Sequence, residues 1–148
     1  MATSEKKPKE KSPNEITLRQ AIEYYSGLQC VEGNEDLPGV LSYRIGRNIA
    51  RLKPLIKESQ EQERKFRKKY GEVTTNAKGI EGIVFKTVSS REKFEDEWDG
   101  YIDHVSEEVN LFKFEESLFK LDAPVDDQPH IPPLFFSNCS DLIVLDKK

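Results

Sequence analysis

The chain has 148 residues, of which 36% are hydrophobic and 34% are charged, and its formal net charge at pH 7 is −4. This length and low apolar share predict one domain with a small core and long solvated faces. No apolar run approaches the ~20 residues of a membrane span, and the N-terminus lacks the apolar segment of a secretory signal, so we expect a cytoplasmic protein with no membrane partner. Nucleic-acid binders are usually basic, so the mild negative charge weighs against that class.

Residues 1–13 are rich in lysine and contain no large apolar side chain after the first residue. Such a segment cannot bury apolar surface, which predicts a disordered tail followed by a single domain over residues 14–148. Within this domain, Thr17 and Gln20 have the spacing of a capping box at the start of a first helix, and Gly27 has the position of a residue that ends it. The apolar face of this helix consists of Leu18, Ala21, Ile22 and Tyr25.

The longest predicted element is a helix over about residues 38–70. Its first residue is a proline, which suits a first turn, and its length would be about 48 Å at 1.5 Å per residue. Pro54 removes one hydrogen bond, so we expect a kink there and no break, because the apolar stripe keeps its phase on both sides. The second half, from Lys57, is dominated by charge and is expected to project into solvent or to pack along one thin seam. The stripe consists of Leu41, Ile45, Ile49, Leu52, Ile56, Phe66 and Tyr70.

Three further elements follow the long helix. Residues 72–79 are polar and predict a connection, and the β-branched and aromatic residues of the segment 80–88 favour a short strand. Ser89 and Glu92 fit a second capping box, which opens a third helix. The apolar face of the third helix consists of Phe94, Trp98, Tyr101, Ile102 and Val105.

The remaining residues predict strands and irregular chain. Residues 109–114 are strand-like in composition. The proline-rich end of the chain is expected to be irregular up to residue 142, and residues 142–145 form an apolar run that suits a closing strand. Together these elements predict an α+β fold. It would have three helices, one of them long and kinked, and a small antiparallel sheet of two to four strands.

Five cations crowd the end of the long helix. They cover most of its circumference and could neutralise phosphates, which would give salt-dependent binding of nucleic acid without sequence preference. The alternative is structural, because cations near the C-terminus of a helix complement its macrodipole. These candidate nucleic-acid-binding residues are Arg64, Lys65, Arg67, Lys68 and Lys69.

An acidic cluster lies on the third helix, where the spacing places Glu92, Asp96, Asp99 and Asp103 on one face. Such carboxylates could hold a divalent cation, as in metal-dependent nucleases. Acidic residues opposite an aromatic stripe are more often the solvated face of a helix, and the chain has no second acidic cluster. The preferred interpretation therefore contains neither a metal site nor a cofactor.

Other catalytic signals are missing from the sequence. The two cysteines, Cys30 and Cys139, and the two histidines lack the paired spacing of a zinc site, and there is no phosphate-binding glycine loop and no glycine–serine nucleophile motif. The cysteines predict free thiols in a reducing compartment, and a disulfide between them stays an alternative.

Aromatic side chains are concentrated in the second half of the chain, and most of them must form the core. The neighbours Phe135 and Phe136 cannot both point inward in an extended segment, so one of them is a candidate anchor for a protein partner. Phe66 and Tyr70 continue the apolar stripe into the charged half of the long helix and are the other candidates for protein contact.

Several motifs follow one another in a recognisable order between residues 37 and 114. Leu37-Pro38 precedes the long helix, Lys69-Tyr70-Gly71-Glu72 closes it, and Glu108-Val109-Asn110-Leu111-Phe112-Lys113-Phe114 follows the third helix. In this order the chain resembles a group of small, uncharacterised proteins encoded by tailed bacteriophages and prophages. The resemblance implies a phage origin and no known activity, and it supplies no catalytic residue.

We therefore expect a non-enzymatic protein of phage origin that binds another protein through the long helix and the aromatic C-terminal half. The partner would be a host factor or a phage component in the host cytoplasm, and a host-directed version would inhibit a bacterial enzyme or defence system. Self-association stays open. One alternative function is a nucleic-acid-binding accessory protein that uses residues 64–69, and another is a metal-dependent nuclease.

Overall fold

The computed structural model describes residues 14–120 and 123–145, so the tail predicted for residues 1–13 lies outside the described residues. The described residues form four α-helices, three short 3₁₀ helices and six short strands. The α-helices are α1 (Leu18–Gln29), α2 (Gly39–Tyr70), α3 (Val88–His104) and α4 (Pro133–Cys139). The 3₁₀ helices span Glu116–Phe119, Val125–Asp127 and Ser140–Leu142.

The strands of the described segments pair into three separate two-stranded sheets. Two of these sheets are antiparallel and one is parallel. The antiparallel pairs are β1 (Glu15–Thr17) with β4 (Ser106–Glu108) and β2 (Glu72–Thr75) with β3 (Glu81–Val84), and the parallel pair is β5 (Phe114–Glu115) with β6 (Ile143–Val144). The broad α+β class is confirmed. The predicted number of helices and the single antiparallel sheet are wrong, because α4 adds a helix and β5 pairs with β6 in parallel.

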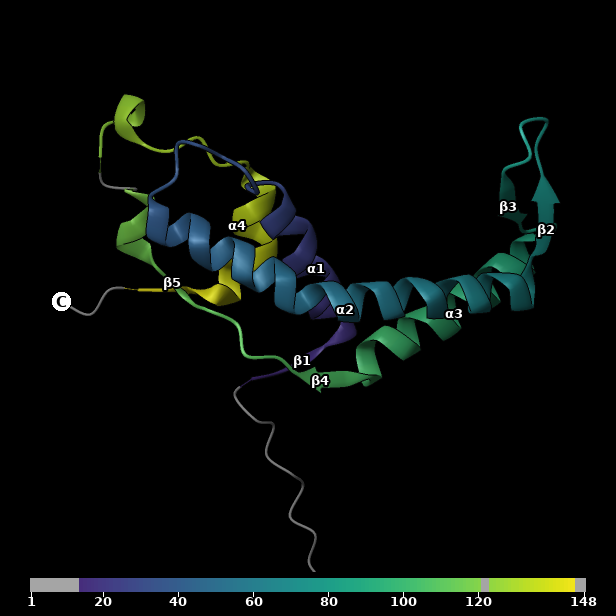
Figure 1. Cartoon of the computed structure of the whole chain (residues 1–148). Helices are drawn as coiled ribbons and strands as arrows, with labels where there is room; N and C mark the ends of the chain where they lie inside the picture. Colours follow the sequence, from purple (N-terminus) through teal and green to yellow (C-terminus); the bar gives the residue numbers. More distant parts are fainter. Residues whose placement is uncertain (1–13, 121–122, 146–148) are drawn as a thin grey trace, which may run out of the picture.

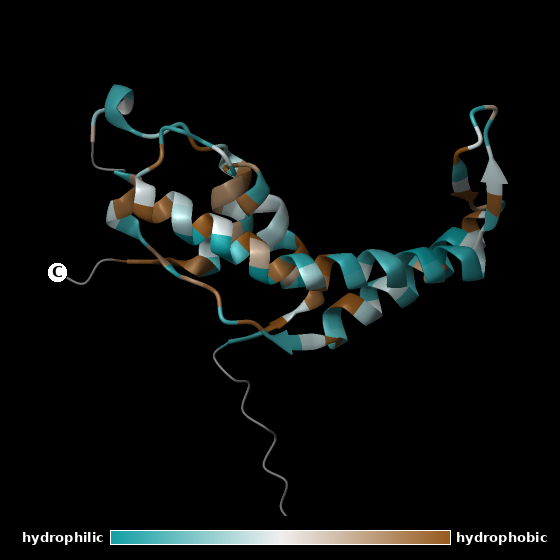
Figure 2. Ribbon diagram, in the orientation of Figure 1, coloured by the Kyte–Doolittle hydropathy of each residue, from teal (hydrophilic) through white to brown (hydrophobic). Residues whose placement is uncertain are grey.

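The molecule consists of a core and a projecting arm (Figure 1). The first half of α2 packs with α1 in the core, whereas its second half runs beside α3 and ends at the β2–β3 hairpin, far from the core. We call residues 57–104 the arm and residues 71–88 the arm tip. Figure 2 shows that the second half of α2 is mostly hydrophilic, in contrast to the half that packs in the core.

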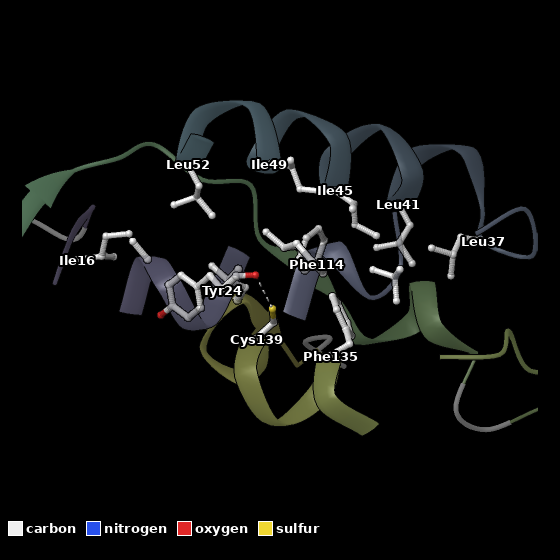
Figure 3. Close-up of a cluster of buried hydrophobic side chains, with 14 of the residues drawn as sticks. Ile16, Tyr24, Leu37, Leu41, Ile45, Ile49, Leu52, Phe114, Phe135 and Cys139 are labelled. Carbon is white, nitrogen blue, oxygen red and sulfur yellow. Dashed lines mark hydrogen bonds between the residues drawn. The ribbon is translucent and has the colours of Figure 1, made fainter. Parts of the chain in front are cut away.

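The core joins α1, α2 and α4 to the segment around β5 (Figure 3). The phenylalanine rings at positions 114, 119 and 135 pack against one another with centroids 5.7 to 6.3 Å apart, and each is exposed by 1% or less. From the predicted stripe on α2, the buried members are Leu41, Ile45, Ile49, Leu52 and Ile56. The stripe prediction is therefore confirmed for the first half of the helix.

The long helix forms with nearly the predicted bounds. It begins at Gly39, after Pro38, and continues without interruption through Pro54 to Tyr70. Figure 1 shows α2 changing direction about midway along its length, as expected for a helix that contains an internal proline. Among the described residues, no helix combines the length and apolarity that a membrane span requires.

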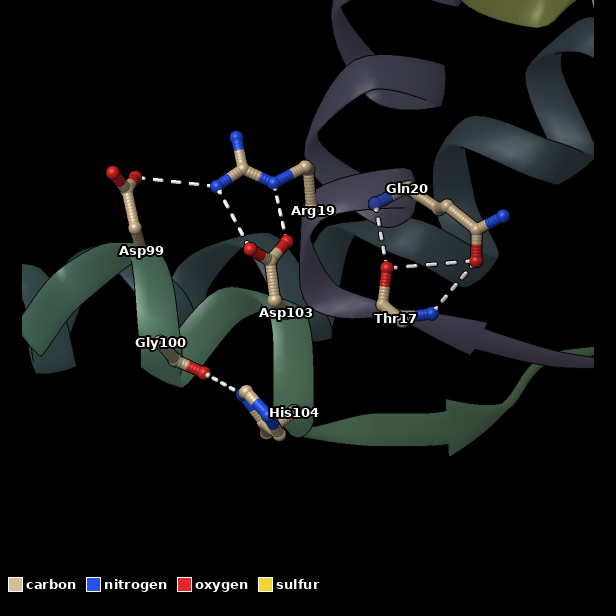
Figure 4. Close-up of polar contacts among 7 residues, drawn as sticks. All are labelled: Thr17, Arg19, Gln20, Asp99, Gly100, Asp103 and His104. Atoms are coloured by element: carbon tan, nitrogen blue, oxygen red, sulfur yellow. Dashed lines mark hydrogen bonds and ion pairs between the residues drawn. The ribbon is translucent and has the colours of Figure 1, made fainter. Parts of the chain in front are cut away.

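The base of the arm is fixed to α1 by charge and by strand pairing. The Arg19 guanidinium binds Asp103 through Nε and lies 3.2 Å from the carboxylate of Asp99, so one side chain of α1 holds two carboxylates of α3 (Figure 4). Just beyond α3, β4 pairs with β1, which directly precedes α1. These contacts set where α3 leaves the core.

The predicted capping box of α1 is confirmed. The Gln20 backbone N–H donates to Thr17 Oγ1 at 3.1 Å, and the Thr17 backbone N–H donates to Gln20 Oε1 at 2.9 Å (Figure 4). The stop expected at Gly27 is wrong, because α1 continues to Gln29 and Gly27 is buried where α1 meets α4. A Cβ at this position would lie 2.7 Å from Cys139 Sγ, so the glycine permits close packing and does not end the helix.

Three other expectations need correction. The cap of α3 is Thr87, whose Oγ1 accepts from the Ser90 N–H at 3.0 Å, and not Ser89. Residues 109–113 are not a strand, because side chains of α2 bind their backbone. Residues 133–139 form α4, because Pro133 occupies the first turn, where its missing N–H costs nothing. The closing strand is confirmed only for β6, residues 143–144.

Candidate functional site

Four of the nine exposed large hydrophobic side chains in the described segments belong to the arm tip, a short part of the chain. Val73 is exposed by 49%, Val84 by 51%, Ile80 by 61% and Val88 by 73%. Exposed apolar residues that cluster beside charged ones mark interaction sites more often than scattered ones do. The arm tip is therefore the candidate functional site.

The hairpin of the arm tip forms for local reasons. Asn76 Oδ1 accepts hydrogen bonds from the backbone N–H groups of Lys78 and Ile80, and the Gly79 N–H donates to the Asn76 carbonyl at 3.0 Å. This asparagine thus closes the turn by mimicking backbone acceptors. The β-branched residues before and after the turn then pair in register, with Val73 opposite Ile83.

A groove of about 420 Å³ lies between the hairpin and the last turns of α2. Because side chains alternate along a strand, the paired residues Val73 and Ile83 share one face of the hairpin with Glu81, and these three line the groove. Gly71 permits the close approach, since a Cβ there would lie 2.6 Å from Ile83 Cγ2. The α2 wall of the groove consists of Arg64, Arg67 and Lys68.

The cations of the groove differ in how they are neutralised. The Arg64 guanidinium lies 3.1 Å from the Glu81 carboxylate, and both side chains are more than half exposed. Arg67 lies 2.8 Å from Glu63, one turn earlier, and its guanidinium carbon is 4.7 Å from the centroid of the Phe94 ring. Over the described ranges 14–120 and 123–145, no carboxylate pairs with Lys68. The groove therefore has a free ammonium group on its α2 wall and the apolar side chains of Val73 and Ile83 on its hairpin wall.

The predicted contact residues Phe66 and Tyr70 lie inside the arm. The ring of Phe66 packs edge-on against Trp98 and Tyr101 of α3, with centroids 6.1 and 5.3 Å apart. The Tyr70 hydroxyl donates to the Glu97 carboxylate. The thin seam expected along the second half of α2 is thus filled by α3 of the same chain.

Three of the five predicted basic residues at the end of α2 form ion pairs with carboxylates of the same chain. Lys69 Nζ lies 3.0 Å from Glu97, and the hydrogen bonds from Tyr70 and Lys69 hold the pKa of Glu97 below its usual value. Arg64 and Arg67 pair with Glu81 and Glu63 as described above. Lys65 and Lys68 stay exposed without an acidic partner in the part of the chain that the structure describes.

The predicted aromatic anchor in the C-terminal half belongs to the core. Phe135 is completely buried, and Phe136 is half-buried with its ring 5.6 Å from Phe119 and 5.5 Å from Phe135. The segment is helical and not extended, so both rings can contact the core cluster. Neither ring therefore joins the arm tip.

The acidic residues proposed for a metal site do not converge. Asp99 and Asp103 contact the Arg19 guanidinium, whose hydrogen bond holds the pKa of Asp103 below its usual value, while Glu92 and Asp96 are exposed. In the described residues, no three histidine, cysteine or acidic side chains lie close enough together to hold a metal ion.

The two cysteines are free thiols in different environments. Cys30 is exposed, whereas Cys139 is completely buried and its Sγ lies 3.5 Å from the Tyr24 carbonyl oxygen. Burial raises the pKa of the Cys139 thiol to about 12, so this sulfur stays protonated and unreactive at neutral pH.

Comparison with known proteins assigns no family to this chain. No family model, no curated protein and no solved structure matches it.

Sequence reasoning missed the hairpin half of this site. The sequence predicts a polar connection over residues 72–79, whereas residues 72–75 form β2 and pair with β3. The available signal was local, since Val73, Thr74 and Thr75 precede a turn that contains Asn76 and Gly79.

Proposed function

We propose that this chain is a phage-encoded, non-enzymatic protein that binds a protein partner with the arm tip. The observation that carries the proposal is the exposure of Val73, Ile80, Val84 and Val88 at the end of an arm whose own seam is already filled. A two-stranded hairpin is marginally stable in isolation, and both faces of this one are largely exposed. A partner that covers it would remove that apolar surface from water.

The arm geometry also supports this function. Arg19, together with the pairing of β1 and β4, fixes α3 at its base, so the hairpin is held away from the core by two packed helices. A partner surface or cleft can thus be reached without the core approaching it. This geometry suits a host-directed role as the inhibitor of a bacterial enzyme or defence system, acting in the host cytoplasm.

Protein is favoured over nucleic acid as the partner for two reasons. Three of the five cations at the end of α2 pair with carboxylates of the same chain: Arg64 with Glu81, Arg67 with Glu63 and Lys69 with Glu97. The exposed surface beside them is apolar, whereas nucleic-acid interfaces are polar and strongly basic.

The proposed function can be tested by excising the hairpin. In the test variant, residues 72–86 are replaced by a short glycine-rich loop, and the control variant carries Val40→Ser and Tyr43→Ser, which change exposed apolar residues at the other end of α2. Each protein is expressed in bacteria and purified under native conditions. We expect a stoichiometric protein partner with the wild type and the control, and none with the excised variant. The same partner bound by a folded, excised variant would refute the proposal.

A further inference from the structure

Building on the proposed function, we infer that the groove between α2 and the β2–β3 hairpin binds an extended acidic peptide segment of the partner. The groove places Lys68 and Arg64 on one wall and the apolar pair of Val73 and Ile83 on the other. The matching ligand has carboxylates that alternate with aliphatic side chains.

Charge complementarity identifies the polar part of this ligand. Lys68 has no carboxylate partner among the described residues, and the pair of Arg64 and Glu81 is more than half exposed on both sides. Exposed ion pairs are weak, so a carboxylate of the partner can compete with Glu81 for Arg64. Two cations of α2, one turn apart, are thereby available to an acidic ligand.

The free edges of the β2–β3 hairpin favour a ligand in an extended conformation. The Asn76 N–H bonds to the Ile80 carbonyl at 3.0 Å, so alternation along the antiparallel pair directs the backbone groups of Val73 and Ile83 to the outer edges. In the described part of the chain, no third strand pairs with either edge. A peptide that adds as a strand would satisfy these groups and place alternate side chains over the groove.

Nucleic acid fits the same groove less well. Its phosphates could meet Lys68 and Arg64 as a carboxylate would, but the hairpin wall offers the aliphatic side chains of Val73 and Ile83 and no aromatic ring for base stacking. The preference for an acidic peptide therefore follows from the composition of both walls.

The test is a nuclear magnetic resonance titration of the full-length protein with synthetic octapeptides. The probe alternates glutamate and valine, and the comparison peptides replace glutamate with lysine or serine. We expect the glutamate peptide to shift the amide signals of residues 64–68, 72–75 and 81–84, with much weaker shifts from the other two. Lys68→Glu should weaken binding at least fivefold. Lys53→Glu, which changes an exposed cation in the part of α2 outside the arm, should leave binding unchanged.

Several results would overturn the inference. These are the absence of shifts with the glutamate peptide, equal shifts with the lysine peptide, and unchanged affinity in Lys68→Glu. Equal or stronger shifts of the same signals by an eight-residue oligothymidylate would assign the groove to nucleic acid instead. If the peptides cause no shifts but partner binding still requires the hairpin, the acidic-peptide ligand is refuted and the proposed function is retained.

Discussion

The side-chain amide of Asn48 forms two hydrogen bonds with the backbone of Phe112. Nδ2 donates to the Phe112 carbonyl at 3.0 Å, and the Phe112 N–H donates to Oδ1 at 2.8 Å. Asn48 is completely buried on α2, and on either side of it Arg44 and Arg51 bind the carbonyls of Lys113 and Asn110. A helix thus supplies, through side chains, the hydrogen bonds that a neighbouring strand would give to residues 110–113.

Replacing Asn48 with alanine should therefore destabilise the protein by about 2–4 kcal/mol, because it leaves the partly buried backbone donor and acceptor of Phe112 without partners. Arg47→Ala is the control, since Arg47 is exposed next to it and should change stability by less than about 0.5 kcal/mol. Urea unfolding measures both variants. Equal stabilities of the two variants would contradict this role of Asn48.

Gly27→Ala should destabilise the protein by about 1–3 kcal/mol, although alanine favours helix. The added Cβ would lie 2.7 Å from Cys139 Sγ and 3.0 Å from Asn138 Cβ. Gly46→Ala in α2 is the matched control, because no atom lies within 4 Å of its added Cβ, and it should stabilise by about 0.5–1 kcal/mol. Thermal unfolding that ranks the two variants in the opposite order would refute the packing argument.

Stability should fall with rising pH between about pH 9 and 12. Burial raises the pKa values of the Cys139 thiol and the Tyr24 phenol to about 12 each, with Asp141 adding to the shift of Tyr24. Over this range the unfolded chain loses protons that the folded chain retains, so the free energy of unfolding decreases. Cys139→Ser should reduce this slope, and Cys30→Ser, at an exposed thiol, should leave it unchanged. Urea unfolding at a series of pH values gives the slope, and identical slopes in both variants would rule out the buried thiol as its source.

Phe66→Ala should loosen the arm while leaving the core intact. Phe66 is half-buried and packs against Trp98 and Tyr101, so its loss should cost about 2 kcal/mol locally. Trp98 is the only tryptophan, and its emission should shift to longer wavelength as α3 separates from α2. Hydrogen exchange should accelerate in α3 and stay slow in α1. Unchanged exchange in α3 would mean that the arm does not depend on this contact.

The parts of the fold that could be predicted are those whose signal is carried by one segment. The stripe from Leu41 to Ile56 and the capping box at Thr17 each depend on spacing alone, and both were correct. The helix α4 was not predicted, because its seven residues, which begin with a proline, are too few to show a helical period in the sequence.

The parts that could not be predicted depend on contacts between distant segments. Residues 109–113 have the composition of a strand, but their backbone groups bind the side chains of Arg44, Asn48 and Arg51. The role of these three polar residues of α2 cannot be recognised in the sequence, because it depends on a distant segment that crosses the helix. Similarly, the sequence showed an apolar seam at Phe66 but not that α3 would fill it. The structure shows that α3 fills this seam and that the hairpin stays exposed, and these two observations identify the candidate site.

Site-specific photo-crosslinking tests the central claim most directly. A benzophenone amino acid is introduced at Val84 on the exposed hairpin, and in separate proteins at Lys57, where the arm begins, and at Tyr43, at the other end of α2. After irradiation in bacterial cells, we predict one discrete adduct with a protein partner from the Val84 position and none from the other two. Adducts from Tyr43 or Lys57 with none from Val84 would contradict the assignment of the arm tip as the binding surface.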